Sequence, residues 1–168
     1  MAKKKKKKKK HYIAQAVRKG IVKRSFPYAK EQGNAYHWTY VLRAKDPHKR
    51  ELIAEAMEKA VRNDGLRYSN TKDGNAVLYD KAKRHNFDPS KVEKATTNCC
   101  NLASVACRYA GIHTPRKSSA RTLPRTWVEK CPNDFQKIQY RHGKTKLKRG
   151  DILDATIKPK VHTAVYLG

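Results

Sequence analysis

The sequence has no apolar run long enough to cross a bilayer, and it has few acidic residues. Only 14 residues are Asp or Glu, against 40 that are Lys or Arg, so the formal net charge is +26. Setting aside the eight lysines of residues 3–10 lowers this charge from +26 to +18, so the rest of the chain is itself strongly basic. This balance predicts an anionic partner, such as teichoic acid, lipopolysaccharide phosphate, nucleic acid or a membrane surface.

The sequence also lacks a recognisable signal peptide, although it begins with a charged run. Gln15, Arg18, Lys19 and Lys23 interrupt the stretch that would have to form the apolar core of such a peptide. We therefore expect folding in a host cytoplasm, with exit by lysis, by a dedicated machine or by packaging in a virion.

The four cysteines and seven histidines form no metal-binding pattern. There is no C-x-x-C pair and no close pair of histidines, and the spacings of a P-loop or an EF-hand are absent. We therefore expect no metal and no cofactor. If Cys100 and Cys107 share one helix, about 10 Å of helical rise separates them, which is beyond the reach of a disulfide. Cys131 could still pair with any of the other cysteines.

Composition divides the chain into a basic arm over residues 1–35, expected to be disordered or loosely packed, and a folded domain over residues 36–168. Within the domain, Asp46-Pro47 predicts the start of a helix that Asn63-Asp64-Gly65 ends. The remaining expected elements are an extended segment or helix lead-in over 36–42, helices over 76–82, 99–110 and 126–131, a polar loop over 116–125, and strands over 135–140, 151–156 and 162–167. Helices followed by clustered strands predict an α+β fold with an antiparallel sheet.

One thiol and one imidazole lie at the starts of predicted elements, where they could take part in catalysis. Cys99 lies at the start of a predicted helix, where the positive end of the helix dipole favours the thiolate. His162 opens the last predicted strand and could act as general base if the fold brings it to the thiol. The pair predicts cysteine-dependent hydrolysis of an amide bond.

Three short segments resemble motifs of the NlpC/P60 superfamily of cysteine peptidases. Residues 98–102 (NCCNL) resemble its D-C-S-G/S-L motif, residues 147–153 (LKRGDIL) resemble its L-x-x-G-D-I/L strand, and residues 162–168 (HTAVYLG) resemble its H-V-G/A-I-Y-L-G strand. Residues 38–47, 66–68 and 86–91 are similar to segments of phage-encoded peptidoglycan hydrolases of this type. The resemblance covers roughly residues 38–168 and implies a papain-like fold, with N-terminal helices packed on a small antiparallel sheet.

The resemblance also implies roles for individual residues. Cys99 would be the nucleophile and His162 the general base, and the backbone N–H of Cys99 would stabilise the oxyanion. Tyr68 would contact substrate, the alternative being that it packs in the core. The implied substrate is a peptide or amide bond of bacterial peptidoglycan, cleaved without a cofactor.

The sequence departs from the family pattern at three places. Asn98 replaces an aspartate that commonly helps to recognise a free amine of the substrate, which puts the substrate preference in question. Cys100 follows the nucleophile position, where it would line the substrate site or act as a rival nucleophile. The third catalytic residue of the family usually lies on the strand after the histidine, and here Asp154, on the neighbouring predicted strand, is the candidate.

Two functions from different classes follow. The first is a peptidoglycan hydrolase that acts at the bacterial cell wall by a Cys–His mechanism. The alternative is a basic, particle-associated protein that binds nucleic acid and keeps an inactive peptidase fold. Net charge favours the alternative, whereas the presence of both Cys99 and His162 favours the enzyme.

Overall fold

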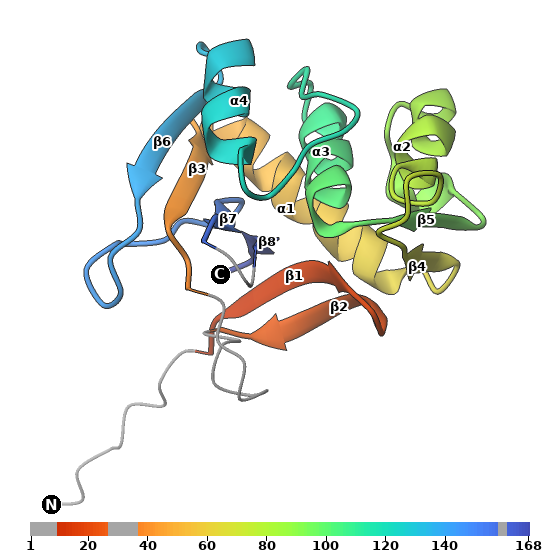
Figure 1. The fold of residues 1–168 in the computed structure, drawn as a ribbon, viewed down its shortest axis with the longest axis horizontal. Coiled ribbons are helices and arrows are strands. Elements are labelled where there is room, and N and C mark those ends of the chain that lie inside the picture. Colours follow the sequence, from red (N-terminus) through yellow and green to blue (C-terminus); the bar gives the residue numbers. More distant parts are fainter. Residues whose placement is uncertain (1–9, 27–36, 158–160) are drawn as a thin grey trace, which may run out of the picture.

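Six antiparallel strands form the main sheet of the computed structural model, which describes residues 10–26, 37–157 and 161–168 (Figure 1). The strand order is β2-β1-β8-β7-β3-β6. The strands are β1 (Tyr12–Val17), β2 (Gly20–Ser25), β3 (Tyr40–Ala44), β6 (Phe135–Gln139), β7 (Ile152–Ala155) and β8 (His162–Tyr166). The predicted α+β class with an antiparallel sheet is therefore confirmed, and the three predicted C-terminal strands lie within a residue or two of their expected bounds.

The expected arm over residues 1–35 is wrong for residues 12–25, which form β1 and β2. Ile13 and Ala14 are fully buried because β1 pairs with β8, with Ile13 opposite Tyr166. A tight turn joins the two strands, and Gly20 supplies its positive φ of 119°. Pairing with a strand about 150 residues away, rather than local sequence, orders this segment. The lysine run over 3–9 and the expected turn over 158–160 lie outside the described residues.

The predicted helices are present, and two of them, which start at Pro47 and Cys99, begin where they were expected. Asp46 caps α1 (Pro47–Arg62) by accepting a hydrogen bond from the backbone N–H of His48 at 2.8 Å. The last predicted helix begins earlier than expected, inside the segment predicted as a loop. The other elements are α2 (Val77–Ala82), α3 (Cys99–Tyr109), α4 (Leu123–Lys130), the short 3₁₀ helices η2 (Lys83–His85) and η3 (Pro89–Lys91), and a parallel strand pair, β4 (Leu66–Tyr68) and β5 (Ala95–Thr97).

Helices α1 and α3 pack on each other and on one face of the sheet, where they form the main core (Figure 1). Leu42 and Ile152 contribute to this core, whereas their strand neighbours Val41 and Leu153 join a second apolar cluster around Trp38. This alternation is that of a sheet buried on both faces. Among the described residues, no helix combines the length and apolar character needed to cross a membrane.

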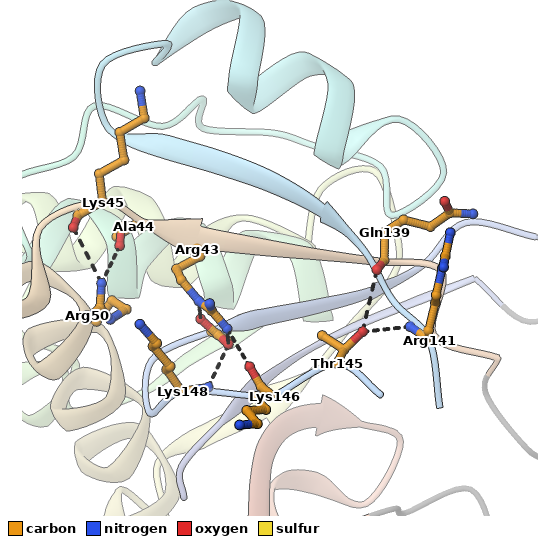
Figure 2. A network of polar contacts seen from close by, with 10 residues as sticks. Arg43, Ala44, Lys45, Arg50, Gln139, Arg141, Thr145, Lys146 and Lys148 are labelled. Carbon is orange, nitrogen blue, oxygen red and sulfur yellow. Dashed lines mark hydrogen bonds and ion pairs between the residues drawn. The ribbon is translucent and has the colours of Figure 1, made fainter. Parts of the chain in front are cut away.

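One buried ion pair ties β3 to the segment that leads into β7. Arg43 donates from Nε and Nη2 to the two carboxylate oxygens of Asp151, at 2.8 and 2.7 Å, and also to the carbonyl oxygen of Lys146 (Figure 2). The backbone N–H of Lys148 donates to the same carboxylate at 2.7 Å. The Asp151 side chain is fully buried, so this network fixes the start of the strand pair that carries His162.

We expect Asp151→Ala to lower the free energy of unfolding by about 3 to 5 kcal/mol, because it leaves the Arg43 charge without its buried partner. Asp80→Ala is the matched control, since Asp80 pairs with Arg116 on the exposed surface. That loss should be below about 1 kcal/mol. Urea denaturation of both variants measures the difference, and equal losses would contradict the structural role of Asp151.

Candidate functional site

The structure brings Cys99 and His162 together at the junction between α3 and the sheet. Cys99 is the first residue of α3, and the Asn98 side chain caps the helix by accepting from the backbone N–H of Asn101 at 2.9 Å. His162 is the first residue of β8, against which α3 packs. A hydrogen bond from Cys100, followed by the charge and hydrogen bond of His162, holds the pKa of Cys99 well below its usual value, although burial opposes this.

The surroundings of Cys100 shift its thiol pKa in the direction opposite to that of Cys99. The two sulfur atoms lie 3.8 Å apart, and Cys100 also lies 3.4 Å from the hydroxyl of Thr163. Its hydrogen bond to Cys99, its burial and the charge of Cys99 raise the pKa of the Cys100 thiol well above the usual value. Cys99 is partly exposed and Cys100 is buried. Of the two, Cys99 has the lower thiol pKa and the more exposed side chain, which makes it the candidate nucleophile.

Gln15 is a partner of His162 that sequence reasoning missed. It lies on β1, is fully buried, and its Oε1 is 2.5 Å from Nε2 of His162. A carbonyl oxygen accepts, so this contact places the proton on Nε2 and leaves Nδ1 as the nitrogen that can take the thiol proton. Gln15 precedes His162 by 147 residues and lies in the presumed arm, so no local signal marked it.

Asp154, the candidate third residue, lies beside this pair and is held by Thr163. The Thr163 hydroxyl donates to Oδ1 of Asp154, while Oδ2 has no hydrogen-bond partner among the described residues. Burial raises the pKa of Asp154 to about 9, and the charge of Cys99 adds to this effect. At neutral pH the carboxyl group is therefore protonated, so it contributes no full negative charge to the site.

We expect the Asp154→Asn variant to become more stable relative to wild type as the pH rises. The folded protein keeps the Asp154 proton up to a pH of about 9, whereas an unfolded chain releases it near the usual pKa of 3.8. The folded state thus holds the extra proton in this window and loses stability as the pH rises, by at most about 1.4 kcal/mol per unit. Asn removes the titration and can still accept from Thr163.

Urea denaturation of wild type and Asp154→Asn at about pH 5 and pH 8 measures this change. A stability difference that is the same at both pH values would show that Asp154 does not titrate in this window.

A cleft of about 610 Å³ opens over Cys99 and His162. Tyr68, Asn98 and Cys100 also line it, so five of the six site residues proposed from the sequence surround one cavity. Burial, and then the charge of Cys99, raise the pKa of the Tyr68 hydroxyl. The described residues include no group of three or more His, Cys, Asp or Glu side chains placed to hold a metal ion.

The side-chain oxygen and the side-chain nitrogen of Asn98 each make a hydrogen bond. Its oxygen accepts from the first turn of α3, and its amide donates to Oδ1 of Asn70 at 3.2 Å. It therefore shapes the floor of the cleft beside the thiol. Residues 16–19 and Arg24, from the expected arm, also line this cleft, and no local sequence pattern marks them.

Comparison with protein-family models matches residues 24–168 to the endolysin-like domain. The matched range includes Cys99 and His162 and excludes Gln15. Searches of the curated proteins and of the solved structures gave no match.

Proposed function

Because the chain belongs to the endolysin-like domain family, we propose that it hydrolyses peptide or amide bonds of bacterial peptidoglycan during phage lysis, with Cys99 as nucleophile. The observation that carries this proposal is the position of Cys99, whose pKa is lowered by Cys100 and His162 at the floor of an open cleft. A low thiol pKa, a partner base and an accessible cavity are together what nucleophilic catalysis by cysteine requires.

In the proposed mechanism, Nδ1 of His162 takes the thiol proton and Sγ of Cys99 attacks the scissile carbonyl carbon. The backbone N–H of Cys99, at the start of α3, stabilises the oxyanion. His162 returns the proton to the leaving amine as the C–N bond breaks. Water, deprotonated by His162, then attacks the thioester, which releases the acid and restores the thiol. Gln15 orients the imidazole throughout.

The same arrangement supports assignment to the NlpC/P60 superfamily and its papain-like fold. A thiol on the first turn of a helix, packed against an antiparallel sheet that carries the histidine, is the arrangement that the sequence motifs imply. In this chain β1 reaches the histidine from the N-terminal side and supplies the orienting amide. Tyr68 and Cys100 would contact the bound peptide from the cleft wall.

End-group analysis of peptidoglycan digested by the purified chain tests this function. New amino groups without new reducing sugars are expected, because the thiolate attacks an acyl carbon and leaves glycosidic bonds intact. Alkylation of the thiol with iodoacetamide should stop their release. Digestion that yields reducing sugars, or that survives alkylation of Cys99, would contradict the proposal.

A second candidate is a particle-associated protein that binds nucleic acid through its basic surface. The net charge of +26 favours it, since neutralising phosphates releases counterions and gives strong, salt-sensitive binding. In the hydrolase, the same charge would hold the protein to anionic wall polymers, and the lysine run would add to it. Tight DNA binding without release of amino groups would select this second candidate.

A further inference from the structure

The β1–β2 hairpin makes one wall of the cleft positively charged. Arg18 and Lys19 form its turn and Arg24 lies on β2, and all three line the cavity that contains Cys99. No Asp or Glu is among the described residues that line this cavity. A bound peptide therefore meets cationic side chains on one side and the thiol on another.

These three cations have no acidic partner in the part of the chain that the structure describes. Nε of Arg24 is buried and makes no hydrogen bond. Arg43 and Arg149, by contrast, are each bonded to carboxylates, Arg43 to Asp151 and Arg149 to Glu51 and Glu58. Arg24, which lines the cavity, therefore has hydrogen-bonding capacity that the described residues leave unused.

Arg18 lines the same cavity as Tyr68 and Cys99. Its charge lowers the pKa of Tyr68, against the larger effects of burial and of Cys99, which raise it. Tyr68 thus senses both the hairpin cation and the thiolate. A peptide bound in this cavity can therefore contact Arg18 as well as the thiol.

Among the described residues that line the cleft, none carries a carboxylate that would bind a substrate amine by charge. Asn98 is neutral, and its oxygen and its amide are engaged by Asn101 and Asn70. Recognition through a free amine would need a carboxylate at this place. The positive charges of the hairpin favour instead the binding of a carboxylate of the substrate.

We propose that the cleft selects peptides that carry a free carboxylate next to the scissile bond, and that Arg18 and Arg24 bind this carboxylate. The proposal rests on the proposed function, since it names the substrate class of the same site. Guanidinium groups bind carboxylates through paired, charge-assisted hydrogen bonds, which amides of the same shape cannot replace.

Binding to the Cys99→Ala variant tests the proposal apart from turnover. The probes are soluble peptides released from peptidoglycan, and the same peptides after their carboxyl groups have been converted to carboxamides with carbodiimide and ammonia. At about 0.15 M salt, which screens remote charges, the free acids should bind about tenfold more tightly or better, as expected for a charged hydrogen bond. Calorimetry measures both constants.

Adding Arg18→Gln and Arg24→Gln should bring the two constants close together. Arg84→Gln is the matched control for Arg18→Gln, because Arg84 is exposed on η2 and does not line the cleft, and each substitution removes one positive charge. It should leave the preference intact. If the double variant does not fold, Arg18→Gln alone, in the exposed turn, should reduce the preference at least about threefold.

Equal binding of acids and amides by the parent variant, or an unchanged preference without Arg18, would overturn the proposal. Failure of the proposed function gives a different result. In that case the wild-type chain would release no amino groups from peptidoglycan, while the preference for carboxylates would still decide whether the anion site exists.

Discussion

Replacing Cys99 by Ala is expected to lower kcat for peptidoglycan hydrolysis by about 10⁴-fold or more, with little change in stability. The nucleophile forms the bond that defines the reaction, and removal of such a group costs about as much as removal of the whole catalytic unit. Cys99 is only partly buried, so truncation to Ala leaves no large cavity in the core. Release of amino groups from purified peptidoglycan measures the rate.

Cys100→Ala is the control for this experiment, because it removes the neighbouring sulfur from the same helical turn. We expect it to keep activity within about tenfold, since the pKa of Cys100 lies well above the usual value and Cys100 does not supply the thiolate. Its hydrogen bond is the largest factor that lowers the pKa of Cys99, so the acid limb of the pH–rate profile should move to higher pH. Activity that survives in Cys99→Ala and is lost in Cys100→Ala would reverse the assignment.

Replacing Gln15 by Ala is expected to lower kcat by about 10- to 100-fold while KM changes little. The variant removes the acceptor that holds Nε2 of His162, so the ring loses both its orientation and its preferred tautomer. Losses of this size are typical when the partner that positions a functional histidine is removed. Steady-state kinetics on a soluble peptide from peptidoglycan separates kcat from KM.

Gln15→Glu distinguishes positioning from packing. It keeps the size of the side chain and an oxygen that can accept from Nε2, so most of the activity should return. Where the glutamate is ionised, it stabilises the imidazolium and moves the limb of the pH–rate profile that reports His162 to higher pH. A Gln15→Glu variant as inactive as Gln15→Ala, with an unshifted profile, would show that Gln15 only fills space.

Local signals in the sequence account for the parts of the fold that could be predicted. Asp46-Pro47 supplies a cap and a fixed φ within two residues, and α1 begins at that position. The approach of Cys99 to His162 could be inferred only through family motifs, because neither residue type alone marks a site. The structure adds the low pKa that makes the pair chemically meaningful.

Three residues that sequence reasoning missed and on which the proposals depend, Gln15, Arg18 and Arg24, lie on the β1–β2 hairpin. Their strand pattern is weak, since polar Gln15 stands among buried apolar residues and basic side chains follow. β1 is stabilised by its pairing with β8, and pairing between distant segments leaves no local periodicity to detect. Gln15 and Arg24 looked like parts of a solvated basic segment for the same reason.

The pairing of β1 with β8 also determines when, during synthesis, Gln15, Cys99 and His162 can come together. Translation adds His162 147 residues after Gln15, and the two meet only when β8 pairs with β1. A growing chain on the ribosome therefore holds the thiol of Cys99 without His162 while the residues between them are added. The proposed catalytic pair, with its orienting amide, is therefore complete only after β8 has been synthesised and has paired with β1.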